Sequence, residues 1–235
     1  MNTFAPRLVT VAHGTRVSSG NLVASAITAR AARRLGRVPF QTSYVELCEP
    51  ALDDVMADNR TPAVVVPLLL STGFHIKHDI PRAVTTSPGA AYLARPLGPH
   101  PLLAEVMCLR LRGAGAHPGD PVVLVAAGSK DADTTYDLAV AGRMLQARWG
   151  APVRVATVSG LGPPISAVVA EARADGRVAV APYLLSPGYF SRKARMLSEL
   201  AGAATFADVL GAHPLVAELV VRRYRAVLAA SRAAA

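Results

Sequence analysis

The sequence predicts an α/β protein made of two tandem, duplicated, doubly wound units, each with a four-stranded, mainly parallel sheet. Short apolar, β-rich runs alternate with longer segments of helical period that are rich in Ala, Leu and Arg. Strands this apolar are covered on both faces, which favours a parallel sheet with helices on either side. The pattern then begins again in the second half of the chain, and this repetition predicts the duplication.

The elements of the first half follow the apolar runs in order. Strands are expected at 7–12, 41–47, 63–70 and 91–98. Helices are expected from about Asn21, after Pro50 and from Pro101. The following stretch, GAGAHPGDP, is rich in Gly and Pro, which is typical of a linker.

Three blocks of the first half recur in the second half in the same order. VAHGTR (11–16) matches VAAGSK (125–130), PLLLSTGF (67–74) matches PYLLSPGY (182–189), and LGPHPLLAEVMCLRLR (97–112) matches LGAHPLVAELVVRRYR (210–225). A repeat of this length is a whole domain rather than a solenoid element. The prediction is therefore an N-terminal unit at 1–112 that carries the active site, a linker at 113–120, and a degenerate C-terminal unit at 121–235.

Composition limits the possible functions. The 235 residues carry a formal charge of +9, and only three of the 25 basic residues are lysines. Such a surface is either simply solvated or attracts a partner with several carboxylates or phosphates. No basic run is interleaved with aromatic residues, so nucleic acid is not an expected partner.

The cysteines and the apolar runs exclude further classes. Cys48 and Cys108 are far apart and form no CxxC motif, which excludes a cysteine-ligated zinc or iron–sulfur site within the chain and any disulfide framework. The first residues lack the apolar core of a signal peptide, and no apolar run approaches membrane-spanning length. A cytoplasmic protein without a membrane partner is expected.

The duplication provides an internal comparison, because residues that build the scaffold should persist in both copies. His100 and His213 both lie in an LG-x-HPL block at the start of a helix. A role shared by both copies is more simply structural, such as a helix-start hydrogen bond before a Pro in the first turn.

Three other polar residues occur in the first copy alone. His13 and His75 follow the first and third predicted strands, and Glu46 lies at the end of the second. Their counterparts are Ala127 for His13, Phe190 for His75 and, if EP at 49–50 is matched to PP at 163–164, Gly160 for Glu46. The carboxyl ends of parallel strands lie along one edge, where ligands bind. Two imidazoles and a carboxylate there could hold a divalent first-row metal ion or transfer protons. Unrelated polar loop residues are the alternative.

Two further histidines lie outside this group of three. His78 follows His75 by three residues, a spacing that places both on one face only if the segment is helical. It is assigned beside the site or to a solvated loop. His117 lies in the linker and is expected to be solvated.

HGTR after the first strand and GFHIKHDIP after the third strand, together with the tandem halves, resemble the sirohydrochlorin chelatase family in its long, two-unit form. These class II chelatases insert Fe²⁺ or Co²⁺ into a sirohydrochlorin-type tetrapyrrole in siroheme or cobalamin biosynthesis. The resemblance implies that His13 and His75 bind metal and assist insertion, with Glu46 as the accompanying acidic residue. It also implies one active site per chain, with the macrocycle in the cleft between the halves.

The resemblance implies partners and substrates as well. The metal is a substrate (Fe²⁺, Co²⁺ or Ni²⁺, which the motifs do not distinguish), no cofactor is bound permanently, and a monomer is expected. The tetrapyrrole carries eight carboxylates, which gives the arginines a partner. Arg16, Lys77 and Arg82 flank the motifs and are candidates for binding these carboxylates, and the matching loop of the second copy holds Arg192, Lys193 and Arg195.

The residue types suit this chemistry. Insertion requires the loss of two pyrrole N–H protons, so a metal with exchangeable ligands must lie close to a proton acceptor. Imidazole can perform both tasks, and a nearby carboxylate orients it and raises its basicity. Few protein ligands are desirable because the metal must leave for the ring nitrogens.

Two alternatives remain open. A protein that carries metal or tetrapyrrole without catalysing insertion would use the same residues. A phosphate- or nucleotide-binding α/β protein is suggested by AAGSKDAD (126–133), although this segment lacks both GxGxxG and the GK[ST] pattern of a P-loop.

Overall fold

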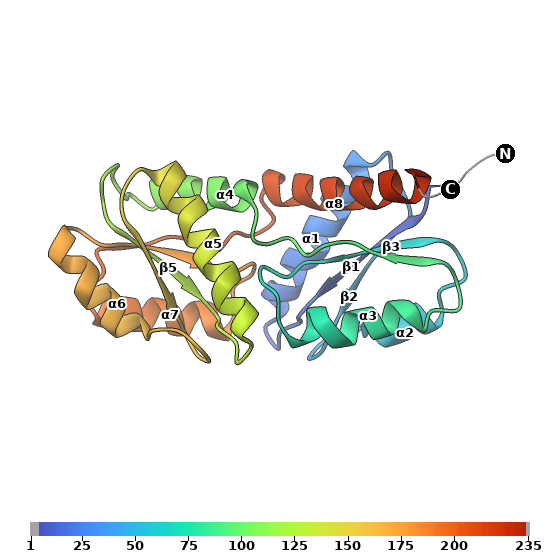
Figure 1. Ribbon diagram of the computed structural model, residues 1–235, viewed down its shortest axis with the longest axis horizontal. Coiled ribbons are helices and arrows are strands. Elements are labelled where there is room, and N and C mark those ends of the chain that lie inside the picture. Colours follow the sequence, from blue (N-terminus) through green and yellow to red (C-terminus); the bar gives the residue numbers. More distant parts are fainter. Residues whose placement is uncertain (1–4, 234–235) are drawn as a thin grey trace. The chain divides into compact units, whose positions relative to one another are not determined.

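The computed structural model describes residues 5–233, in which two compact units each contain one parallel sheet (Figure 1). The strand order of the first sheet is β2-β1-β3-β4, and that of the second is β6-β5-β7-β8. All pairs are parallel. The strands are β1 (Arg7–Ala12), β2 (Phe40–Tyr44), β3 (Ala63–Pro67), β4 (Ala91–Leu93), β5 (Val122–Ala126), β6 (Val153–Thr157), β7 (Ala179–Tyr183) and β8 (Thr205–Phe206). The predicted pair of four-stranded parallel sheets is confirmed.

Helices cover both faces of each sheet, as the apolar strands predicted. They are α1 (Ser18–Arg34), α2 (Leu52–Ala57), α3 (Ile80–Thr85), α4 (Pro101–Gly113), α5 (Ala132–Trp149), α6 (Ile165–Ala172), α7 (Tyr189–Leu200) and α8 (Pro214–Ala233), with a short 3₁₀ turn at Arg173–Asp175 after α6. In the first unit α2 and α3 pack against one face of β1 and β3, while α1 and α8 lie on the other side (Figure 1). In the second unit α6 and α7 contribute to a matching core.

The central strands are buried because helices cover them on both sides. Every residue of β3 and β5 is buried. β1 also buries a polar side chain, that of Thr10, whose hydroxyl lies 2.6 Å from the hydroxyl of Thr28 in α1. This bond satisfies both hydroxyl groups inside the core.

The last helix of each repeat belongs to the other compact unit. Residues up to Leu97 and from Ala212 onward form the first unit, and Gly98–Gly211 form the second. Accordingly α8 packs against α1 and β3, whereas α4 packs against α5 and β7. Arg223 of α8 donates a hydrogen bond to the Leu97 carbonyl (3.2 Å).

The expected boundaries 1–112 and 121–235 therefore describe the sequence repeats, whereas the compact units exchange helices α4 and α8. The physical reason is that an apolar helical face must be buried, but its periodicity does not say which of two similar sheets receives it.

The helix-start hydrogen bonds predicted for His100 and His213 are confirmed. His100 Nδ1 accepts from the Leu102 N–H (3.1 Å), and His213 Nδ1 accepts from the Leu215 N–H (3.2 Å). Each bond satisfies one of the backbone donors that the first turn leaves open.

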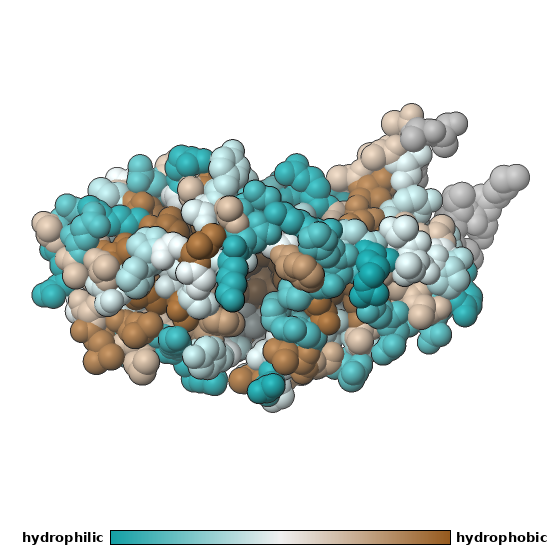
Figure 2. Space-filling model, turned by 60° about the horizontal axis from the view of Figure 1, so that its bottom comes forward, coloured by the Kyte–Doolittle hydropathy of each residue, from teal (hydrophilic) through white to brown (hydrophobic). Residues whose placement is uncertain are grey.

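Two surface features lie outside the predicted motifs. Figure 2 shows apolar and hydrophilic side chains interspersed over one face, and the exposed apolar residues of α7 include Met196 and Leu200. His117 is exposed, and its Nδ1 lies 3.1 Å from the guanidinium of Arg177.

Among the described residues, no helix combines the length and apolar character needed to cross a membrane.

Candidate metal centre

Three polar side chains meet at the carboxyl edge of the first sheet. His13, Glu46 and His75 follow β1, β2 and β3, which are neighbours in the order β2-β1-β3. Each offers one ligand atom, and these atoms all lie within 4.8 Å of one another. His13 Nε2 is 3.4 Å from Glu46 Oε1, and the two imidazole centroids are 5.1 Å apart. The structure therefore brings together the three residues that the duplication singled out.

Backbone pairing beyond β1 and β2 sets Glu46 beside His13. The Val45 N–H donates to the Ala12 carbonyl (2.9 Å), and the Glu46 N–H donates to the His13 carbonyl (3.1 Å). Gly14 has a φ of 95°, and a Cβ built on it would lie 1.8 Å from the Glu46 carbonyl oxygen. The close approach of the two loops therefore requires glycine in the HGTR motif.

Asn21 in α1 holds the loop that follows His13. Its side-chain amide donates to the Thr15 carbonyl (2.8 Å), and its Oδ1 accepts from the Thr15 N–H (3.1 Å). The Asn21 side chain thus pairs with both the N–H and the carbonyl of Thr15, as the backbone of a neighbouring strand would. These two hydrogen bonds hold the loop after His13 in place.

His75 begins a π-helical turn, His75–Asp79, that leads into α3. The Ile80 N–H donates to the His75 carbonyl five residues back. Pro81 has no N–H and its ring crowds the carbonyl four residues earlier, so a wider turn just before it is favourable. Single π-helical turns of this kind are frequent at functional sites.

Asp79 orients His75, and sequence reasoning gave it no role. His75 Nδ1 lies 2.7 Å from Asp79 Oδ2. Because an ionised carboxylate only accepts, Nδ1 carries the proton and the Nε2 lone pair is available to a metal. The signal was present in HIKHD, since residues four apart share a helical face.

In His13, as in His75, Nε2 is the nitrogen available to a metal. Its Nδ1 lies 3.3 Å from the Gly14 carbonyl, which can only accept. The lone pair of Nε2 therefore faces the Glu46 carboxylate. Two such acceptors repel each other unless a cation or a proton lies between them, so the cluster is suited to hold either a metal ion or a proton.

The cluster is accessible. The side chains of His13 and Glu46 are 47% and 49% exposed, and that of His75 is 27% exposed. Three such groups on an open surface would leave coordination positions for an incoming ligand, as catalytic rather than structural metal sites do.

The other predicted residues lie outside the group of three. The His78 ring packs against Phe74, with ring centroids 4.7 Å apart. The Arg82 guanidinium donates to Asp53 of α2 (2.9 Å), and this hydrogen bond raises the pKa of Arg82. Arg16 and Lys77 are exposed in the segments that carry His13 and His75.

The second unit keeps the frame of the site and lacks its ligands. The Val158 N–H donates to the Ala126 carbonyl (2.9 Å), and the Ser159 N–H donates to the Ala127 carbonyl (3.1 Å). By this pairing Ala127 matches His13 and Ser159 matches Glu46. The residue four positions after Phe190 is a buried alanine, Ala194.

The expected match of Glu46 with Gly160 is therefore wrong by one residue. The backbone bridge between Tyr44 and Ala51 corresponds to the bridge between Thr157 and Pro164. This register places Pro50 opposite Pro163, whereas the sequence alignment had paired it with Pro164. The conclusion about the lost carboxylate is unchanged, because serine cannot supply one.

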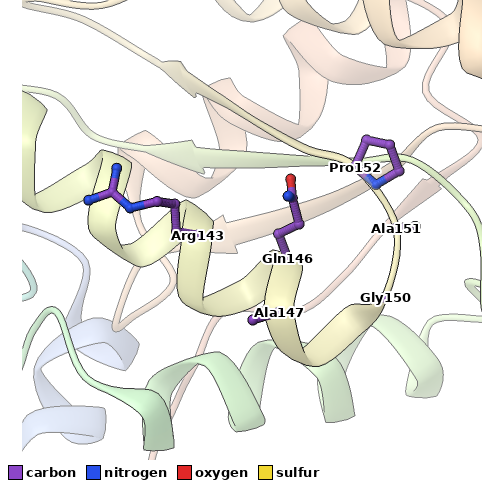
Figure 3. Close-up of a pocket in the computed structure, with 6 residues that line it drawn as sticks. All are labelled: Arg143, Gln146, Ala147, Gly150, Ala151 and Pro152. Carbon is purple, nitrogen blue, oxygen red and sulfur yellow. The ribbon is translucent and has the colours of Figure 1, made fainter.

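A depression in the second unit lies away from this chemistry. Its volume is about 670 Å³, and Figure 3 shows its lining, which is Arg143, Gln146, Ala147, Gly150, Ala151 and Pro152. These residues come from the end of α5 and the turn before β6, at the amino edge of the sheet. Gln146 Oε1 already accepts from the Val153 N–H (3.0 Å).

Comparison with known proteins assigns the family. The sequence model of the CbiX family matches residues 7–114 and again residues 121–227. The two matches cover most of the chain and fall on the two repeats, and the chain belongs to the CbiX family.

Two sirohydrochlorin ferrochelatases are similar over nearly the whole chain, and a cobaltochelatase is similar over less than half of it. The sirohydrochlorin ferrochelatase of Bacillus subtilis is 27% identical over 94% of this chain and 91% of its own length. That of Priestia megaterium is 28% identical, over 93% and 89% respectively. The sirohydrochlorin cobaltochelatase of Methanococcoides burtonii matches 43% of this chain over 89% of its own length, at 26% identity.

Solved structures agree with the fold. SirB from Bacillus subtilis with Fe³⁺ has a TM-score of 0.80 at 26% identity and covers 97% of both chains. The sirohydrochlorin chelatase SirB from Bacillus subtilis subspecies spizizenii in complex with cobalt has a TM-score of 0.74 at 25% identity, over 94% of both chains.

Proposed function

We propose that this protein is a sirohydrochlorin chelatase, which inserts a divalent metal ion into the tetrapyrrole. The observation that carries the proposal is the meeting of His13, Glu46 and His75, with ligand atoms within 4.8 Å, at the carboxyl edge of the first sheet. Membership of the CbiX family and similarity to sirohydrochlorin ferrochelatases support it.

The three ligands present the metal substrate without trapping it. Two imidazole nitrogens and one carboxylate leave positions for water and then for ring nitrogens. Their exposure lets a large planar ring approach. Iron and cobalt are the first metals to test, because related structures contain Fe³⁺ and cobalt.

Proton removal follows from the same atoms. Insertion exchanges one M²⁺ for two pyrrole protons, so that M²⁺ and the free ring give the metallated ring and two H⁺. As the metal leaves for the ring, the Nε2 lone pairs of His13 and His75 become free to accept these protons. Asp79, 2.7 Å from His75 Nδ1, stabilises the imidazolium that forms on His75.

Basic side chains near the site could bind the carboxylates of the substrate. Arg16, Lys77 and Arg82 lie in the segments that carry the site, and we assign them to carboxylate binding. To bind a substrate carboxylate, the Arg82 guanidinium must either keep its hydrogen bond to Asp53 and bind the substrate as well, or give up that hydrogen bond. One site per chain is proposed, because the second unit has Ala127, Ser159 and Phe190 at the ligand positions.

The test is anaerobic incubation of the purified chain with sirohydrochlorin and, separately, Fe²⁺, Co²⁺ and Ni²⁺, followed by absorbance. We expect many metallated rings per chain with at least one metal. The matched control is the triple variant His13→Ala, Glu46→Ser, His75→Phe, which imports the residues of the second unit. Its rate should fall by at least about 10²-fold. A wild-type yield limited to one metallated ring per chain would identify a carrier instead.

A further inference from the structure

The residue after Glu46 has a conformation that does not suit its side chain. Leu47 has a φ of 64°, in the left-handed region that disfavours residues with a Cβ and especially large ones. Its side chain is also 50% exposed. Neither property helps the fold, so the presence of leucine here calls for another explanation.

The second unit shows that the turn does not need leucine. Since Ser159 matches Glu46, Gly160 matches Leu47, and Gly160 has nearly the same φ, 71°. Glycine adopts this conformation without strain. The first unit therefore keeps a strained, exposed leucine at a position where the same turn is made by glycine in the other copy.

An exposed apolar side chain also lies beside His75. Phe74, directly before His75, is 63% exposed, and its ring centroid lies 6.2 Å from that of His75. We call Leu47 and Phe74 the apolar rim. Large exposed apolar side chains next to a polar centre are typical of a ligand-binding surface.

We propose that the apolar rim binds a face of the sirohydrochlorin macrocycle, with Leu47 as a residue that determines substrate affinity. This inference rests on the proposed function. The ring is roughly flat, its two faces are largely apolar around the central nitrogens, and its carboxylates lie at the periphery. A metal held by three ligands can enter the ring nitrogens only if a face of the ring lies against the site. Apolar contacts around the ligands would hold that face, and strain at Leu47 is retained because the contact needs its side chain.

The experiment compares Leu47→Gly with wild type in three measurements: thermal melting, Co²⁺ titration calorimetry, and fluorescence titration with metal-free sirohydrochlorin. We expect Leu47→Gly to melt at or above the wild-type temperature, because glycine relieves the strain. Its Co²⁺ affinity should stay within about twofold, since no ligand changes. Its affinity for sirohydrochlorin should fall about 5- to 10-fold, as expected for losing the burial of a half-exposed leucine.

Two further comparisons separate contact from flexibility. Leu47→Met keeps an apolar side chain and should retain sirohydrochlorin affinity within about twofold, whereas Leu47→Asn tolerates the left-handed conformation and should lose affinity as the glycine variant does. Phe74→Ala should weaken sirohydrochlorin binding about 10-fold. Phe40→Ala is its matched control, because Phe40 is 51% exposed at the amino end of β2, and it should have no effect.

The outcomes distinguish the two proposals. If wild type binds sirohydrochlorin and the Leu47→Gly and Leu47→Asn variants bind it equally well, the apolar rim is not a binding surface and the chelatase proposal stands. If wild type binds Co²⁺ but not sirohydrochlorin, the proposed substrate is wrong and the rim inference fails with it.

Discussion

Asp79 Oδ2 lies 2.7 Å from His75 Nδ1 across a single π-helical turn. This contact occupies Nδ1 of His75 and leaves its other nitrogen, Nε2, available to a metal. It also means that the carboxylate beside the site does not need to touch the metal in order to affect it. Removing the charge of Asp79 should therefore change the metal affinity while the three ligands remain in place.

Asp79→Asn tests this relationship. The amide keeps the size of the side chain but loses its charge, so His75 Nδ1 loses a charge-assisted hydrogen bond. We expect the Co²⁺ affinity to fall about 10- to 100-fold, the usual effect of losing a carboxylate behind a histidine ligand. Titration calorimetry measures it, with Asp58→Asn on the exposed end of α2 as the matched control. An unchanged affinity in Asp79→Asn would remove Asp79 from the site.

Residues imported from the second unit should remove metal binding without unfolding the first. His75→Phe and Glu46→Ser place into the first unit what the second unit tolerates at the matching positions. Their free energy of unfolding should change by no more than about 1–2 kcal/mol, while Co²⁺ binding is lost. Denaturant unfolding measures the stability of each variant, and titration calorimetry on the same samples measures its Co²⁺ binding. Unfolded variants would show that these side chains are structural.

Gly14 and Gly128 form a matched pair. A Cβ at either position would lie 1.8 Å from a carbonyl oxygen, that of Glu46 or of Ser159, in a backbone with positive φ. Substitution by alanine should destabilise the protein by a few kcal/mol at each. Only Gly14→Ala should also weaken Co²⁺ binding, because it separates Glu46 from His13. Equal loss of binding in Gly128→Ala would contradict the assignment of the site to the first unit.

His213→Ala should act on stability alone. The lost bond from the Leu215 N–H to His213 Nδ1 is a helix-start interaction that contributes about 1 kcal/mol. Thermal melts should show this loss, and the insertion rate should remain near that of wild type. A folded variant without activity would indicate a role for His213 in the chemistry.

Apolar runs and the internal repeat were sufficient to predict both sheets and the three polar residues that meet at the edge of the first sheet. The strands are buried on both faces, so their apolar pattern is strong, and the three polar residues are the ones that differ between the two copies. Other features depend on backbone geometry that residue types do not reveal. The role of Asp79 depends on the helical turn before Pro81. The match of Ser159 with Glu46 depends on the register of the strands. The strain at Leu47 depends on its φ angle alone.

The exchange of α4 and α8 has a consequence for the order in which the chain can complete its structure during synthesis. The unit Gly98–Gly211 is continuous, so all of its strands and helices have emerged from the ribosome before α8 is made. The first sheet is synthesised earlier but must wait for Pro214–Ala233 before α1 and β3 receive their partner. Contacts over such sequence separations form slowly. The half that carries His13, Glu46 and His75 is therefore begun first and completed last, and the apolar surface that α8 covers stays exposed during that interval.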